Sequence, residues 1–238
     1  AADAGMLTVA RLGEDGGVLC YSDKAWAGKC QVISLGRSLE PLPGPVLVVN
    51  DGVTDQIAVG QAGASKAMVC YGDGQKRHHG ICRVLTADGG SLQAGPPVTV
   101  NEASTAYFVL GRLDTHRNLF CFQDRGNGGR GTCKILTVVG RKIWVGPGVV
   151  VNDAATVMLA LGRLGGDRSF LCYEDSRSGW AVACLVLRVA GDRIDVGPAL
   201  ALPRGGAAAA AAPAEGELAI GELGLDSDGE GAAAVVVC

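Results

Sequence analysis

A repeat of 51 residues is the feature that most constrains how this chain can fold. Gly-Pro pairs begin at Gly44, Gly95, Gly146 and Gly197, and each lies 51 residues after the one before. Three further apolar blocks recur with them in a fixed order, and the first repeat reads LTVARL, VLCYSD, GKCQVI and GPVLVVND. Four blocks that recur four times in one order indicate tandem copies of a single structural unit.

Each block has the character of a short β-strand. The blocks are rich in Val, Leu, Ile and Tyr and are bounded by Gly, Pro, Asn and Asp, as strands between tight turns are. A four-stranded unit of about 50 residues cannot bury its faces alone, whereas radial packing of several such units forms a β-propeller. We therefore predict an all-β fold, a β-propeller of four-stranded antiparallel blades.

The repeats predict a single propeller domain over residues 1–238. Residues 217–238 hold half a repeat, because LAIGELG matches LALGRLG of the preceding copy and VVVC matches its first cysteine strand. These numbers favour five blades, the last incomplete in this chain, and leave open what completes it. The four full repeats are 6–52, 56–103, 107–154 and 158–204, and an Ala-rich stretch at 205–216 is predicted to be a flexible linker.

Eight of the nine cysteines form four regular pairs. The two members of a pair are separated by 10 residues in the first repeat and by 12 in the others, and each pair flanks a predicted hairpin loop. Residues that face each other across a hairpin keep that relation when the loop shortens by two, so the spacing favours disulfides over buried free thiols or a metal site. The predicted bonds are Cys20–Cys30, Cys70–Cys82, Cys121–Cys133 and Cys172–Cys184, with Cys238 unpaired.

An aspartate follows the first cysteine of every full repeat by three residues. Two interpretations stand: a ring of acidic groups that binds sugar hydroxyls or a cation, or turn openers that bond the backbone two residues on, which we favour. Asn50, Asn101 and Asn152 after the last strand of a repeat are likewise interpreted as turn formers. The four aspartates are Asp23, Asp73, Asp124 and Asp175.

The residue four positions before the second cysteine varies between repeats. It is Trp26, His78, Gly129 or Trp180, and a loop tryptophan or histidine beside charged residues suits a sugar face or a protein partner. The alternative is a tryptophan that folds back over its own hairpin. We name Trp26, His78 and Trp180, with the four aspartates, as candidate binding residues.

Charge and motifs argue against several function classes. The net charge of −3 and the isoelectric point near 5.6 argue against nucleic acid as the main partner, because a nucleic-acid-binding protein needs a basic face that neutralises many phosphates. No apolar run approaches the roughly 20 residues that span a bilayer, and no phosphate-cradling glycine loop or nucleophile motif occurs. We predict no catalytic residues, no metal site, no cofactor and no transmembrane segment.

The motifs C-[YF]-x-D, G-x-C-x-[VIL]-L and G-P-x-V-x-V-N-[DE], read across the repeats, resemble tandem propeller-like repeats of marine microalgae and bacteria that generally have no assigned activity. The resemblance covers the four full repeats. It implies a propeller fold and carries little information about chemistry. The count of five blades is also similar to that of some small lectins, although no lectin motif accompanies it.

These observations predict a non-catalytic interaction or scaffold module. The main interpretation is an accessory subunit with protein partners in a larger assembly, one that faces a lumen if the assembly is membrane-bound. The alternative is a lectin-like propeller that binds glycans. Disulfides would place the chain in an oxidising compartment: secreted, at the cell surface, or in an organelle lumen such as the thylakoid lumen.

Overall fold

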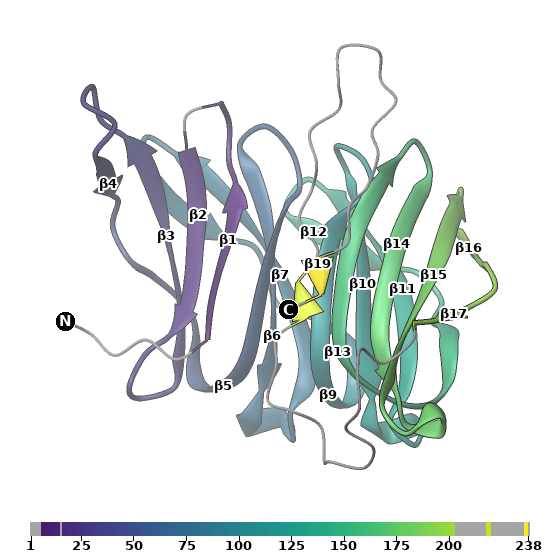
Figure 1. The fold of residues 1–238 in the computed structure, drawn as a ribbon. Helices are drawn as coiled ribbons and strands as arrows, with labels where there is room; N and C mark the ends of the chain where they lie inside the picture. Colours follow the sequence, from purple (N-terminus) through teal and green to yellow (C-terminus); the bar gives the residue numbers. More distant parts are fainter. Residues whose placement is uncertain (1–5, 15, 203–217, 220–235, 238) are drawn as a thin grey trace.

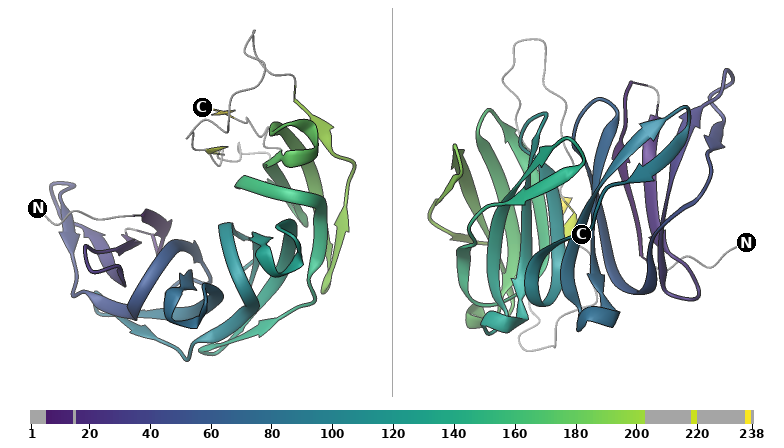
Figure 2. Two further views of the ribbon diagram at one scale, coloured as in Figure 1. Left: turned by 90° about the horizontal axis from the view of Figure 1, so that it is seen from below. Right: turned by 180° about the vertical axis from the view of Figure 1, so that it is seen from behind.

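The fold is built from antiparallel sheets, here called blades, that stand side by side along an arc (Figure 1; Figure 2, left). The first strand of each blade lies on the inner side of this arc, and we call the space that these inner strands face the channel. The computed structural model describes residues 6–14, 16–202, 218–219 and 236–237. Blade 1 holds β1 (Leu7–Arg11), β2 (Gly16–Ser22), β3 (Ala27–Leu35), β4 (Pro41–Pro43) and the start of β5 (Leu47–Gln61). Blade 2 holds the rest of β5, β6 (Lys66–Asp73), β7 (His79–Asp88), β8 (Ser91–Ala94) and the start of β9 (Val98–Arg112).

The next two blades repeat this arrangement. Blade 3 holds the rest of β9, β10 (Arg117–Asp124), β11 (Arg130–Val139), β12 (Lys142–Val145) and the start of β13 (Val149–Gly165). Blade 4 holds the rest of β13, β14 (Arg168–Asp175), β15 (Ala181–Ala190), β16 (Arg193–Val196) and β17 (Leu200–Ala201). The predicted all-β antiparallel architecture is thus confirmed. In the described residues the blades form an open arc rather than a closed ring (Figure 2, left).

Neighbouring blades share a strand. The first part of β5 pairs with β3, where Leu47 lies opposite Cys30, and its second part pairs with β6, where Ile57 lies opposite Tyr71. β9 and β13 do the same between the later blades. The interpretation of Asn50 and its two equivalents as turn formers is therefore wrong, because these residues lie inside long strands that pass from one blade to the next.

The repeated Gly-Pro pair interrupts the outer strand of a blade without breaking its ladder. The amide of Gly44 still donates to Val32 of β3 at 2.8 Å, and Gly95, Gly146 and Gly197 make the same bond in their blades. A side chain on Gly44 would come within 2.1 Å of the carbonyl oxygen of Gly90, in the β7–β8 turn of the next blade. Glycine is needed there because adjacent blades approach backbone to backbone.

The core lies between the blades. Val18 and Val32 of blade 1 pack in one cluster with Val69 and Ile81 of blade 2, and two further clusters fill the next two junctions. β6 is buried on both faces, whereas burial alternates along β2, whose blade is the first of the arc. Radial packing thus supplies the partner that an isolated four-stranded sheet lacks.

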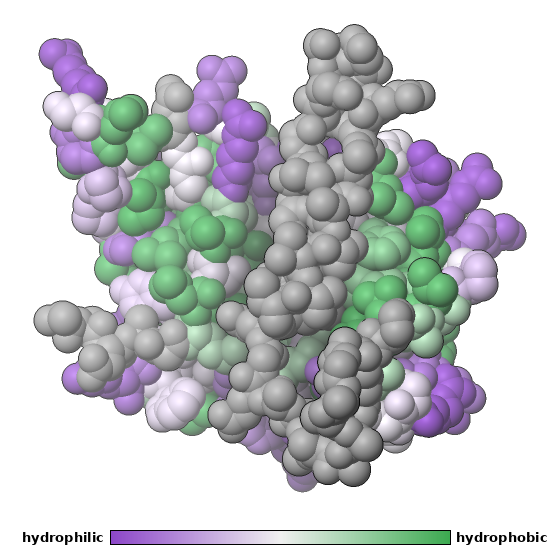
Figure 3. All heavy atoms as spheres, viewed as in Figure 1, coloured by the Kyte–Doolittle hydropathy of each residue, from purple (hydrophilic) through white to green (hydrophobic). Residues whose placement is uncertain are grey.

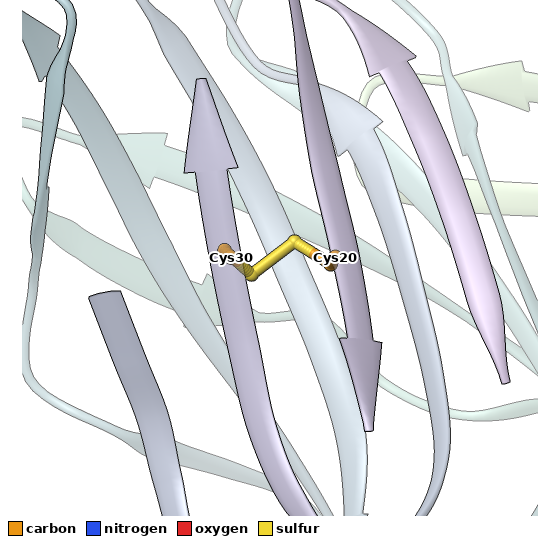
Figure 4. Close-up of a disulfide and its surroundings, with 2 residues drawn as sticks. All are labelled: Cys20 and Cys30. Atoms are coloured by element: carbon orange, nitrogen blue, oxygen red, sulfur yellow. A yellow bond between two sulfur atoms is a disulfide. The ribbon is translucent and has the colours of Figure 1, made fainter. Parts of the chain in front are cut away.

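All four predicted disulfides are present, each within one hairpin. Cys20 of β2 lies directly opposite Cys30 of β3 (Figure 4), and the other three pairs occupy the equivalent positions. The two Cα atoms of each pair are 4.1 Å apart. Disulfides of this number are typical of an oxidising environment. Within the described residues, no helix is long and apolar enough to cross a membrane.

Two short strands belong to the predicted half repeat. β18 (Leu218–Ala219) pairs antiparallel with β19 (Val236–Val237) and contacts β13, the inner strand of blade 4. An inner strand followed by a second strand is what the half repeat predicts. The linker at 205–216 and Cys238 lie outside the described residues, and a total of five blades stays a prediction.

Candidate functional site

The loops between the second and third strands of the blades lie at one end of the molecule, the lower end in Figure 1. In blades 2 to 4 they form the short helices η1 (Gly74–Lys76), η2 (Arg125–Asn127) and η3 (Ser176–Ser178). The strands that cross between blades pass beside them, since the amide of Thr54 donates to Trp26, that of Thr105 to His78 and that of Thr156 to Gly129. We call this end the loop face.

The four predicted aspartates are turn openers. Each side chain accepts a hydrogen bond from the amide two residues on, at 2.9 Å for Asp23 and between 3.0 and 3.1 Å for Asp73, Asp124 and Asp175. Asp23 also pairs with Lys29 at 2.5 Å, and this bond holds the pKa of the carboxyl group below its ordinary value. The turn interpretation is confirmed by these bonds, and the carboxylates have partners within the chain.

A buried Asn-Thr pair beside these turns escaped the sequence analysis. The amide group of Asn152 donates to Thr156 at 2.9 Å and to Asp175 of the next hairpin at 3.3 Å. Asn50 donates to Thr54, and Asn101 to Thr105 and to the carboxylate of the following hairpin. The signal was present, because a threonine follows each of these asparagines by four residues.

The variable loop position has an unusual backbone. Trp26, His78, Gly129 and Trp180 all have φ between 62° and 75°, in the left-handed region that favours glycine. For a residue with a Cβ this conformation costs about 1–2 kcal/mol. Gly129 shows that the fold needs no side chain at this position, yet three of the four blades carry a bulky one. Residues in such strained conformations are enriched at functional sites. Trp26 is 54% exposed, His78 is exposed and Trp180 is partly buried.

A cavity of about 330 Å³ lies between blades 2 and 3 on the loop face. Blade 2 contributes His78 and Asp55, whose side chains are in hydrogen-bond contact. Blade 3 contributes Tyr107 and Arg125, and Nε of Arg125 donates to Gln123 at 3.0 Å. Tyr107 has φ of 47° at a bulge in the inner strand. We call Asp55, His78, Tyr107 and Arg125 the interblade pocket. Its full lining also includes Gln56, Ser104, Thr105 and Ala106.

A second cavity, of about 520 Å³, lies at the preceding junction. Its polar lining includes Asp51, Gln75 and Lys76, with Tyr71 and Arg83 beneath them. Arg83 donates to Val49 of blade 1 at 2.8 Å, and the hydroxyl group of Tyr71 donates to the same carbonyl at 3.3 Å. These two side chains hold the blades together. Of the predicted binding residues, His78 lines the first cavity and Asp73 the second, whereas Trp26 and Trp180 line neither.

Several solved structures share this fold. The SapL1 lectin in complex with α-methyl fucoside superposes with a TM-score of 0.58 at 10% identity, over 90% of this chain and 67% of that one. The Aleuria aurantia lectin in complex with Fucα1-6GlcNAc superposes with a TM-score of 0.55 at 13% identity, over the same shares. An exo-β-1,3-galactanase from Phanerochaete chrysosporium reaches 0.50 at 11% identity, over 81% of this chain and 49% of that one.

Neither a protein-family model nor a curated protein sequence matches the chain. At identities of 10 to 13%, the solved structures show a shared all-β propeller-like fold. This fold carries both lectins and a glycosidase among those neighbours. Function must therefore be argued from the residues of this chain.

Proposed function

We propose that the protein binds carbohydrate, and that the interblade pocket is a binding site. The observation that carries the proposal is the pocket itself, in which two blades bring a carboxylate, an imidazole, a phenol and a guanidinium to one exposed cavity. Sugar hydroxyl groups both donate and accept hydrogen bonds. Asp55 can accept from them and Arg125 can donate to them through its terminal nitrogens.

Aromatic groups add the second element of sugar recognition. Tyr107 offers a flat apolar ring with a polar tip at the pocket. Trp26 stands exposed on the loop face, at a left-handed position where Gly129 of blade 3 shows that the fold does not require a side chain. The lectin neighbours, which were solved with fucosides, make α-methyl fucoside the first ligand to try. An extracellular or lumenal location agrees with the disulfides.

A glycan array followed by calorimetric titration with α-methyl fucoside tests the proposal. We expect Arg125→Ala to weaken binding at least tenfold, because the guanidinium group donates directly to the sugar. Arg193→Ala, at an exposed arginine of β16 far from the loop face, is the matched control and should bind as the native protein does. Absence of binding to every glycan on the array, or equal affinities for the two variants, would exclude this site.

The interpretation as an accessory subunit of a larger assembly stays a prediction, as do the absence of catalysis and the thylakoid-lumen location. Purification of the native complex from its source would test the first of these. Recovery of the chain with stable protein partners would support the subunit interpretation, and this result is compatible with a glycan-binding loop face.

A further inference from the structure

The inner strands carry a second set of polar residues at their other end. Arg11, Gln61, Arg112 and Arg163 occupy equivalent positions in the LTVARL, IAVGQA, FVLGRL and LALGRL blocks of β1, β5, β9 and β13. Gln61 follows Thr54 of the loop face by seven residues, which is about 20 Å along a strand. These four residues lie along the inner side of the arc, at the mouth of the channel opposite the loop face, and Figure 2, left, shows the arc that the inner strands form.

They line a single cavity of about 520 Å³. The rest of its lining is apolar or small, apart from the hydroxyl group of Ser169. The glycines let the inner strands approach, since a side chain on Gly111 would come within 2.6 Å of Leu161 of the next blade. Among the described residues, no carboxylate lines this cavity.

Short-range bonds hold three of the four polar side chains, those of Arg11, Gln61 and Arg112, in place. Nε of Arg11 donates to the carbonyl of Gly13 at 3.0 Å, and Nε of Arg112 donates to that of Asp114 at 3.1 Å. Gln61 makes the corresponding bond to Gly63 at 3.4 Å. Each donor thus bonds the backbone two residues further on. A bond through Nε leaves the terminal nitrogens of the guanidinium group for other partners.

Only one of those terminal nitrogens has a side-chain partner among the described residues. Nη1 of Arg112 donates to the side-chain oxygen of Gln61 at 2.6 Å, which links blades 3 and 2. Arg163 has no side-chain bond to any described residue. Three guanidinium groups therefore share one cavity in a chain whose net charge is −3.

A hollow lined by charges of one sign focuses its field on the opposite charge. The like charges of Arg11, Arg112 and Arg163 also repel one another, and an anion between them would relieve that repulsion. The planar fork of arginine matches the oxygens of phosphate and sulfate in pairs. We propose that this mouth of the channel binds an oxyanion with two or more negative charges, of the phosphate or sulfate class.

The inference does not depend on glycan binding, because the two sites lie at opposite ends of the inner strands. The half repeat carries Glu222 at the position aligned with Arg163, and this residue lies outside the described part of the chain. The carboxylate of Glu222 would compete with a soluble anion for the arginines, so the experiment includes a variant that removes this carboxylate.

Calorimetric titration of the full chain with inorganic pyrophosphate, phosphate and sulfate at constant ionic strength tests the proposal. We expect pyrophosphate to bind with a measurable affinity in a buffer whose chloride concentration is held constant, so that displacement of chloride alone does not explain the heat. Arg163→Gln and Arg11→Gln should each weaken pyrophosphate binding at least tenfold. Lys142→Gln, at an exposed cation on β12, should change it less than twofold. A comparison of phosphate with sulfate identifies which of the two oxyanions the site prefers.

Three results would overturn the proposal. The first is no binding of any of the three anions by the native chain. The second is equal affinity of Arg163→Gln and the native chain, with the melting temperature of the variant unchanged. The third is binding by Glu222→Gln alone, which would show that the arginines serve a carboxylate of the chain itself rather than a soluble ligand.

Discussion

Three bulky residues on the loop face keep a backbone conformation that glycine adopts freely. Trp26, His78 and Trp180 share positive φ angles with Gly129 at the equivalent site of blade 3. The hairpin needs the left-handed turn because the amide at this position bonds back to the turn aspartate in all four blades. The side chain itself is not needed for that bond, which is why its identity varies between repeats.

The variant Trp26→Gly separates folding from function at this position. Removing the left-handed strain gains about 1–2 kcal/mol, and the greater freedom of glycine in the unfolded chain returns about 0.5–1 kcal/mol. Trp26 is 54% exposed, so little packing is lost. We expect urea unfolding to show a stability equal to the native value or up to about 1 kcal/mol higher. A clear loss of stability would identify Trp26 as a packing residue.

Two buried tyrosines make the protein sensitive to alkali. Burial raises the pKa of Tyr71 and of Tyr173 above the ordinary value of about 10. A raised pKa means that the folded state holds its proton more tightly than the unfolded state does. The contribution to stability is therefore complete below pH of about 10 and is lost as the pH rises through the folded value.

Phenolate absorbance during an alkaline titration measures this effect. We expect the phenols of Tyr71 and Tyr173 to ionise above pH of about 10, in a late phase that coincides with unfolding. Tyr71→Phe and Tyr173→Phe should each remove part of the late phase. A late phase of the native amplitude in either variant would contradict the assignment.

At the scale of the element, the hairpin with its disulfide is the regular unit. Cys121 and Cys133 are fully buried and lie opposite each other on β10 and β11. A bond that closes a loop of 12 residues stabilises by about 3 kcal/mol in the chain-entropy description. We expect the double variant Cys121→Ala/Cys133→Ala to lose about 2–4 kcal/mol in denaturant unfolding.

Reduction of the native protein provides the control for that variant. Reducing conditions break all four disulfides of the native chain and the remaining three of the double variant, so the two reduced proteins should show similar stabilities. If the variant were much less stable than the reduced native chain, the loss would come from the packing of the buried cysteines instead.

Structural features that depend on contacts between residues close in the sequence could be predicted from the sequence. The strands, the four disulfides and the turn aspartates depend on contacts within one hairpin, and their spacing in the chain already encodes those contacts. The bond from Asn152 to Asp175 joins two hairpins, so neither residue alone revealed it. Asn50, Asn101 and Asn152 carry a residue type common in turns, and their pairing within long strands overrode that preference.

At the scale of the whole molecule, the blades are joined by side chains that reach a neighbour's backbone. Arg83 bonds Val49 of blade 1 at 2.8 Å and Gly95 of its own blade at 2.9 Å. Lys134, 51 residues later, bonds Val100 at 2.6 Å, and burial lowers its pKa. The fourth blade has Leu185 at this position. These bonds fix the spacing at which the interblade pocket can form.

Loss of one such bond should loosen a junction rather than a single blade. Arg83→Met keeps the length of the side chain and removes both bonds, which we expect to cost about 1–3 kcal/mol. Amide exchange measured by mass spectrometry should accelerate at the end of blade 1, around Val49. Arg193→Met, on an exposed edge, is the control. Unchanged exchange in blade 1 would show that apolar packing alone sets the junction.

Features that depend on how the blades are placed were beyond the sequence. The interblade pocket and the arginine-lined cavity each contain residues from separate repeats, and a local sequence pattern does not indicate which face of a strand lines the channel.

Figure 3 shows apolar surface over the first blade, where Leu7 and Val9 of β1 are exposed beside the channel. A sequence reading would have assigned such residues to a core.

The strands shared between blades bear on how such a chain can change its length. A segment of 51 residues that is cut inside β5 or β9 begins and ends in the middle of equivalent strands. Duplication or deletion of one such segment in a gene would rejoin two half-strands of matching register and keep the backbone pairing of the shared strand on both sides. The fold should therefore tolerate a change by whole repeats far better than a change by a few residues.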